Sequence, residues 1–270
     1  MSQDSIAFDG SIPALYDRHL GPLLFELYAK DIARRVADVK PRRVLEIACG
    51  SGRVTRQLDA MLAPDAEIVA TDLSESMIAY ASGAHEMTPR VTWQQADGMA
   101  LPFDDDAFDV VVCQFGLMFF PDPSLGLREM ARVSAPGGHL LLSTWDSFDA
   151  NPYARVVHER VAAFFPDQPP QFMHVPFAMN DRAVLHAMAV AAGFADTEIL
   201  RLPGDSEAPS ARDAARGFVR GNPLAVQLTE RGANLDTIEA AVTAGLVELG
   251  GDTPFRMQMR ALLVHGRTPG

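Results

Sequence analysis

The chain has 270 residues, a formal net charge of −12 at pH 7, and hydrophobic residues at 48% of its positions. This length and composition suffice for one large α/β domain, or for one domain with an inserted cap. The acidic balance, without any run of five basic residues, argues against nucleic acid and an anionic membrane surface as partners, because both attract clustered Lys and Arg.

The two cysteines, Cys49 and Cys113, do not form a CxxC pair, which is typical of a protein from a reducing compartment. The first ten residues lack the basic and apolar segments of a signal peptide, and no apolar run is as long as a membrane span. We therefore expect a cytoplasmic protein with no membrane partner, either a monomer or a homodimer.

Strand and helix patterns alternate along the first 145 residues. An irregular arm is expected at 1–22, and apolar residues then recur at helical spacing over 23–38. The predicted strands are 43–48, 67–72, 91–97, 108–115 and 139–145, and the predicted helices among them begin after Gly52 and cover 74–81 and 124–133. A turn is expected at Pro136-Gly137-Gly138. This alternation favours a parallel, doubly wound sheet.

The pattern loosens after Trp145. A segment rich in proline and aromatic residues, 166–177, separates two predicted helices. The elements expected here are helices at 152–165 and 181–192, a strand at 196–202, two or three short helices between 210 and 249, and a last strand at 259–267.

A glycine-rich turn follows the first predicted strand. Gly50 and Gly52 allow the backbone to turn sharply and to approach a ligand closely. Asp72 ends the second strand, where an acidic side chain can accept hydrogen bonds from both ribose hydroxyls of a nucleoside. A turn and an acid in this arrangement fit either a nicotinamide cofactor or S-adenosylmethionine.

Three details favour S-adenosylmethionine. The third glycine of the dinucleotide pattern GxGxxG is replaced by Thr55. Glu46, just before the turn, suits a ligand with a cationic end and not one with a pyrophosphate. Asp97 ends the third strand, where it can accept a hydrogen bond from an adenine amino group.

Four segments, in this order, resemble the motifs of class I S-adenosylmethionine-dependent methyltransferases. The resemblance is closest to the ubiquinone/menaquinone-type small-molecule group and covers about residues 40–145. The segments are 44–55, 71–78, 95–122 and 128–145. The chain departs from the family at two positions, with Ala48 where glycine is frequent and Glu46 where aspartate is frequent.

The resemblance implies an α/β fold with a doubly wound, mostly parallel, seven-stranded sheet, whose last strand runs antiparallel, plus a helical and aromatic cap insert. It implies S-adenosylmethionine as cofactor and S-adenosylhomocysteine as product, with Glu46 beside the turn. By position, the methionine part of the cofactor would be lined by Ala48, Gly50 and Gly52 and closed off by Tyr16, with Gln114 beside the sulfonium. The ribose would be held by Asp72. The adenine would pack near Leu73 and Met77, and its edge would be framed by Asp97, Gly98 and Met99.

Several of these residues have simpler interpretations. Met77 can be a core methionine, Gln114 a polar strand terminus, and Tyr16 an aromatic that packs the arm. The three aspartates at 104–106 are most simply a solvated turn, so no metal site is expected.

Methyl transfer mainly requires alignment of an acceptor lone pair with the S–CH3 bond, so no catalytic residue is assigned. The expected acceptor is a small, planar metabolite (a heterocycle, phenol or quinone precursor) methylated on N, O or C. Candidates for its pocket are Phe8, His19, Trp145, Phe172, His174 and Phe177, of which Trp145, Phe172, His174 and Phe177 are preferred. His174 is the better candidate for a base if the acceptor must lose a proton.

Four parts are expected along the chain. They are an N-terminal arm and helix over the active site at 1–40, the cofactor-binding core at 41–145, a cap insert at 146–195, and the C-terminal part of the sheet with a helical insert at 196–270. Two alternatives stay open, a non-catalytic S-adenosylmethionine-binding protein on the same fold and an NAD-dependent oxidoreductase.

Overall fold

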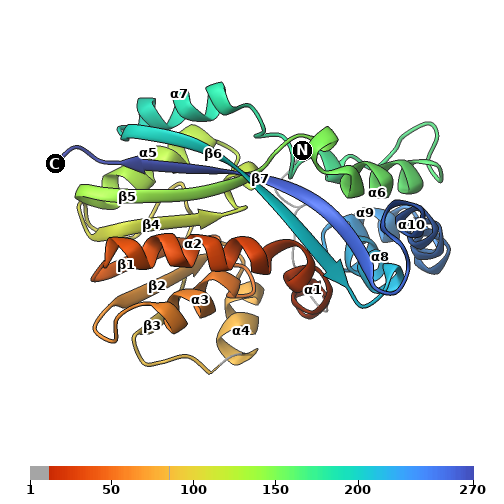
Figure 1. Ribbon diagram of the computed structural model, residues 1–270, viewed down its shortest axis with the longest axis horizontal. Coiled ribbons are helices and arrows are strands. Elements are labelled where there is room, and N and C mark those ends of the chain that lie inside the picture. Colours follow the sequence, from red (N-terminus) through yellow and green to blue (C-terminus); the bar gives the residue numbers. More distant parts are fainter. Residues whose placement is uncertain (1–11, 85) are drawn as a thin grey trace. The chain divides into compact units, whose positions relative to one another are not determined.

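The structure, a computed structural model, describes residues 12–84 and 86–270 (Figure 1). It divides into two compact units. The sheet unit contains residues 28–146, 178–202 and 261–270. The helical unit contains the described residues up to 27, together with 147–177 and 203–260.

Seven strands form one sheet in the order β3-β2-β1-β4-β5-β7-β6 (Figure 1). They are β1 (Arg43–Ile47), β2 (Glu67–Asp72), β3 (Val91–Gln95), β4 (Phe108–Gln114), β5 (Ser134–Trp145), β6 (Ala195–Ala208) and β7 (Phe255–Arg267). Strands β1 to β5 are parallel, and β7 runs antiparallel to β5, from the pair His139↔Arg267 to Trp145↔Ala261. The predicted doubly wound α/β sheet with an antiparallel last strand is thus confirmed.

Helices cover both faces of the sheet. Their bounds are α2 (Glu26–Val39), α3 (Arg53–Met61), α4 (Glu75–Ala84), α5 (Pro123–Val133) and α7 (Arg182–Ala192), with a 3-10 turn, η3 (Leu117–Phe119). Successive side chains of β4 alternate between two core layers. Val110 and Val112 pack with residues of α2 and α3, whereas Val111 and Cys113 pack with residues of α5 and α7. In a sheet of this kind, ligands bind at the carboxyl ends of the parallel strands.

The helical unit is built around three helices between 210 and 250. Its elements are α1 (Ile12–Leu15), the π-helix η2 (Tyr16–Phe25), η4 (Phe148–Ala150), α6 (Pro152–Ala162), η5 (Phe172–His174), α8 (Ala211–Arg220), α9 (Leu224–Glu230) and α10 (Leu235–Gly250). The Arg220 guanidinium of α8 donates a 2.7 Å hydrogen bond to the buried Glu239 carboxylate of α10. The expectation of two or three short helices in this region is confirmed.

The irregular arm expected at 1–22 is wrong for its described part, because residues 12–25 are helical. Pro22 lies inside the π-helix, where Leu20, Leu23 and Leu24 are buried. Gly217 of α8 permits this packing, since a Cβ atom there would lie 2.8 Å from the Leu20 side chain. The burial of these leucines therefore outweighs the tendency of proline and glycine in this segment to break a helix.

The turn expected at Pro136-Gly137-Gly138 is also wrong, because these residues lie within β5. The pairing of β4 with β5 shifts register between Phe108 and Val110, and Gly137 has φ +74°. The segment is therefore an irregularity inside a strand, which glycine accommodates. The last two strands are longer than predicted and begin at Ala195 and Phe255.

Candidate functional site

Three alternate residues after β1 adopt left-handed backbone conformations. Ala48 has φ +56°, Gly50 has φ +54° and Gly52 has φ +79°. Between the first two, the Cys49 backbone N–H donates a 2.9 Å bond to the Thr71 carbonyl at the end of β2. The chain therefore coils tightly over the strand ends before α3 begins. Ala48 is the strained member, because a side chain in this region costs about 1–2 kcal/mol.

Asp72 connects the glycine turn to the loop after β2. Its Oδ2 atom accepts a 2.8 Å bond from the Gly50 N–H, and its Oδ1 atom accepts a 2.9 Å bond from the Ser74 N–H. Burial raises the pKa of Asp72, and these backbone donors oppose the rise. A carboxylate offers about four acceptor positions, so further donors can still bind to it. The sequence suggested only ligand binding here, whereas the structure adds that Asp72 shapes the turn.

Gly50 and Gly52 lack side chains for different reasons. A Cβ atom on Gly50 would have no atom within 4 Å, so this glycine faces open space. A Cβ atom on Gly52 would lie 2.8 Å from Cη2 of Trp93, so this glycine is required by packing. The open space at Gly50 and the 59% exposed side chain of Leu73 mark the side of the turn that a ligand can reach. Met77, by contrast, is buried, as its core interpretation requires.

Glu46 is a buried acid under the turn. Its side chain is 2% exposed, and its Oε2 atom accepts a 2.6 Å bond from the Thr55 hydroxyl of α3. Burial raises the pKa of Glu46 to about 8, the Thr55 hydroxyl opposes this shift, and the negative charge of Asp72 adds to it. Sequence reasoning used Thr55 only as a break in the dinucleotide pattern and missed its bond to Glu46.

The loop after β3 contains the residues expected at the adenine edge. The Asp97 carboxylate accepts a 2.9 Å bond from the Met99 N–H and so turns the loop. A Cβ atom on Gly98 would lie 2.4 Å from Cζ of Phe120, so packing alone requires glycine there. The residues predicted to frame adenine therefore also build the loop itself.

Two residues of α5 hold the continuation of this loop. Glu129 accepts a 2.9 Å bond from the Leu101 N–H, and Arg132 donates to the carbonyls of Leu101 and Phe103 at 3.0 and 2.8 Å. Arg132 also binds Glu129 and Asp105. Sequence reasoning quoted this helix as part of a motif but gave neither residue a role. The one available signal in the sequence was the spacing of Glu129 and Arg132, two opposite charges three residues apart on one helix.

An aromatic trio lies at the carboxyl ends of β4 and β5. The rings of Phe115 and Trp145 stack at 4.1 Å with an interplanar angle of 9°, and Tyr28 meets both edge-on at 5.5 and 5.7 Å. All three are buried. Phe115 directly follows the half-buried Gln114 and has φ +54°, which for a bulky residue is a strained conformation. Trp145 was predicted at the acceptor pocket, but Tyr28 and Phe115 were missed.

The remaining candidates in the described part of the chain lie in the helical unit. Tyr16 stacks on Phe25 at 5.1 Å, and the His19 imidazole lies 3.8 Å from Asp213. Phe172 is buried, and Phe8 falls outside the described residues.

The aromatic segment before α7 divides into a buried and an exposed part. Phe177 is buried and contacts Phe148 and Tyr153, with ring centroids 4.7 and 6.4 Å away. His174 is exposed, and its ring contacts Phe148 at 5.1 Å and His158 at 4.5 Å. An acceptor role for these residues stays a prediction.

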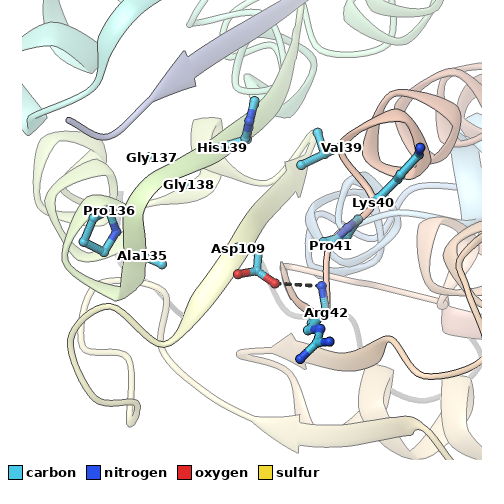
Figure 2. Close-up of a pocket in the computed structure, with 10 residues that line it drawn as sticks. All are labelled: Val39, Lys40, Pro41, Arg42, Asp109, Ala135, Pro136, Gly137, Gly138 and His139. Carbon is cyan, nitrogen blue, oxygen red and sulfur yellow. Dashed lines mark hydrogen bonds between the residues drawn. The ribbon is translucent and has the colours of Figure 1, made fainter. Parts of the chain in front are cut away.

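A cavity of about 380 Å³ lies at the opposite ends of the strands from the glycine turn, beside the amino ends of β1 and β4 (Figure 2). Its lining residues are Val39, Lys40, Pro41, Arg42, Asp109, Ala135, Pro136, Gly137, Gly138 and His139. In its centre, Asp109 Oδ2 accepts bonds of 2.7 and 2.9 Å from the N–H groups of Arg42 and Arg43. None of the predicted site residues lines this cavity, so it is not the predicted cofactor site.

Comparison with known proteins agrees with this geometry. Residues 45–142 match a family model described as "Methyltransferase domain". Demethylmenaquinone methyltransferase from Clavibacter sepedonicus is 36% identical over 143 residues, which is 52% of this chain and 57% of that protein. The chain thus spans little more than half the length of this curated relative.

Solved structures share the fold. The YcgJ protein of Bacillus subtilis matches with a TM-score of 0.59 and 21% identity, over 90% of this chain and 99% of that one. Haemonchus contortus phosphoethanolamine N-methyltransferase 2, in complex with phosphomonomethylethanolamine and S-adenosylhomocysteine, matches with a TM-score of 0.62 and 15% identity, over 96% and 57%.

The seven-stranded sheet belongs to a fold that this chain shares with solved methyltransferase structures. Residues 45–142 thus match a methyltransferase domain, and the curated relative from Clavibacter sepedonicus is similar to this chain over 143 residues, in agreement with the resemblance seen in its motifs. Between residues 12 and 270, with position 85 set aside, no helix is both long and apolar enough to cross a membrane.

Proposed function

We propose that the protein transfers a methyl group from S-adenosylmethionine to N, O or C of a small, planar metabolite. The observation that carries this proposal is the Asp72 carboxylate at the carboxyl end of β2. It is fixed by hydrogen bonds from the Gly50 and Ser74 N–H groups, and Gly50 faces open space. A carboxylate fixed in this way can accept hydrogen bonds from a ribose diol without reorganising. The quinone-type relatives and the matched domain support the activity.

The residues at the turn fit this cofactor. Asp72 would bind the ribose, Gly50 would leave space for the methionine chain, and the exposed Leu73 would cover the adenine. The bound cofactor supplies a methyl group already activated on a sulfonium. The protein contributes alignment and exclusion of water, and good orientation of two reactants is worth about 7–11 kcal/mol.

A planar acceptor is supported by the curated relatives named demethylmenaquinone methyltransferases. An NAD-dependent oxidoreductase is disfavoured, because the buried Thr55 side chain occupies the position that the dinucleotide pattern gives to glycine.

Titration calorimetry with S-adenosylhomocysteine, with NADH in a parallel run, tests the cofactor. Asp72→Asn should weaken S-adenosylhomocysteine binding about ten- to hundredfold, because hydrogen bonds to a charged group are worth about 1.5–3 kcal/mol. Asp109→Asn is the matched control, since Asp109 also accepts two backbone N–H bonds but lies at the other edge of the sheet. Binding of NADH alone, or equal losses in both variants, would contradict the proposal.

Turnover distinguishes an enzyme from a binding protein. Labelled S-adenosylmethionine should methylate at least one member of a panel of quinols, phenols and heterocycles. Tight binding of the cofactor product with no turnover on the panel would favour the non-catalytic alternative.

A further inference from the structure

Glu46 and Thr55 form a buried pair without a cation. Glu46 is 2% exposed and Thr55 is fully buried, and their side chains meet at 2.6 Å. In the described part of the chain, no Lys, Arg or His forms an ion pair with Glu46. An ionised carboxylate without a counter-charge is costly in such surroundings, so the free protein favours the neutral acid.

The pair links two elements that frame the glycine turn. Glu46 is the penultimate residue of β1, two positions before Ala48, and Thr55 lies in the first turn of α3. The hydroxyl of Thr55 thus holds the Glu46 carboxyl under the turn that is proposed to receive the methionine part of the cofactor. A ligand ammonium at this turn would supply the cation that the pair lacks.

We infer that Thr55 is a positioning residue that holds Glu46 as the counter-charge of the cofactor's ammonium group, so that cofactor binding releases a proton from Glu46. The O–H bond of the Glu46 carboxyl breaks, the proton goes to solvent, and the carboxylate is left facing the ammonium. This inference rests on the proposed function, because it requires a ligand with an amino-acid end.

The other titratable groups near Glu46 do not explain such a proton. Burial raises the pKa of the Cys113 thiol to about 12 and that of the Cys49 thiol well above its usual value, so both stay protonated. Asp72 on β2 also has a raised pKa. It is proposed to bind the ribose, however, so its contribution should appear with any ligand that has this sugar.

Two ligands separate Glu46 from Asp72. S-adenosylhomocysteine has the ammonium group, whereas methylthioadenosine has the same nucleoside and lacks the amino-acid end. Calorimetry between pH 6 and 7.5, in buffers of different ionisation enthalpy, counts the protons released. With the pKa of free Glu46 at about 8, S-adenosylhomocysteine should release close to one proton, and methylthioadenosine should release far fewer. The affinity for S-adenosylhomocysteine should rise up to tenfold per pH unit.

Variants at position 55 test the positioning role. The Thr55 hydroxyl lowers the pKa of Glu46, so Thr55→Val should raise this pKa further and reduce S-adenosylhomocysteine affinity at pH 7.5 several-fold. Methylthioadenosine affinity should not change. Thr55→Ser should restore the wild-type pH profile, and Glu46→Gln should remove the excess of protons released over methylthioadenosine.

The possible results are distinct. If S-adenosylhomocysteine binds without net proton release, or if methylthioadenosine releases as many protons, the inference is overturned and the proposed function stands. If S-adenosylhomocysteine does not bind at all, the proposed function fails and the inference fails with it. The wild-type proton count decides this even if the Thr55→Val variant does not fold.

Discussion

Replacing Gly116 by alanine should destabilise the protein through a direct contact with Ala48. Gly116 has φ −102° and ψ −42°, a conformation open to any residue, so space and not backbone freedom requires glycine here. A Cβ atom would lie 2.5 Å from Cβ of Ala48 and 2.9 Å from Sγ of Cys113. At Ala48, by contrast, it is the backbone that favours glycine, because its φ is +56°.

These distances set the expected magnitudes. Overpacking of this kind costs about 1–3 kcal/mol, so Gly116→Ala should lower the free energy of unfolding by about that amount. Ala48→Gly relieves about 1–2 kcal/mol of left-handed strain and loses about 0.5–1 kcal/mol through the greater freedom of the unfolded chain. Alone it should therefore be between neutral and about 1.5 kcal/mol stabilising. In the double variant the Cβ–Cβ contact disappears, so the two changes should couple by about 1 kcal/mol or more.

Urea unfolding of the wild type, both single variants and the double variant measures this coupling. Gly83→Ala is the control, because Gly83 lies in α4 and a Cβ atom there meets nothing within 4 Å. It should leave stability unchanged or slightly raise it. The reasoning is refuted if Gly116→Ala is as harmless as Gly83→Ala, or if the two changes add within about 0.5 kcal/mol.

Three further outcomes are expected. Gly52→Ala should cost about 2–5 kcal/mol in urea unfolding, from left-handed strain plus the clash with Trp93, and a loss below 1 kcal/mol would contradict this. Arg132→Lys should lower the free energy of unfolding by about 1.5–3 kcal/mol, because lysine cannot reproduce the forked bonds that hold the loop after β3. A melting temperature equal to that of the wild type would refute it. Burial lowers the pKa of His139 and His265, whose rings are joined by a 2.9 Å contact, so the unfolded chain binds more protons and stability should fall as pH drops through about 6.5. His139→Gln should flatten this slope in urea titrations from pH 8 to 5, and an unchanged slope would argue against the pair.

The central fold could be predicted because local signals and burial agree there. Val110 to Cys113 form a continuous apolar run, and the structure uses both of its faces, as a strand between two helical layers must. The glycine turn and Asp72 are close in the fold because both follow parallel strands that end at one edge. Short-range pattern was sufficient for these features.

Other parts of the site depend on contacts far apart in the sequence. Tyr28 and Phe115 lie 87 positions apart in the sequence, and no pattern in either local segment predicts the contact between their rings. Arg132 reaches a loop about 30 residues earlier, and its partners there are backbone carbonyls, which have no sequence signature. The helix at 12–25 was missed because proline and glycine are strong local signals that buried leucines can overrule.

The place of β7 in the sheet has a consequence for synthesis of the chain. Strand β6 lies at the end of the sheet, and β7 is its neighbour there. During translation, residues 195–208 therefore emerge well before residues 255–267, the strand they pair with, and β5 meanwhile presents an open edge. The first five strands can assemble vectorially as they leave the ribosome, but closure of this edge must wait for the last strand. A nascent chain arrested before residue 255 would expose the edge to solvent and to other chains.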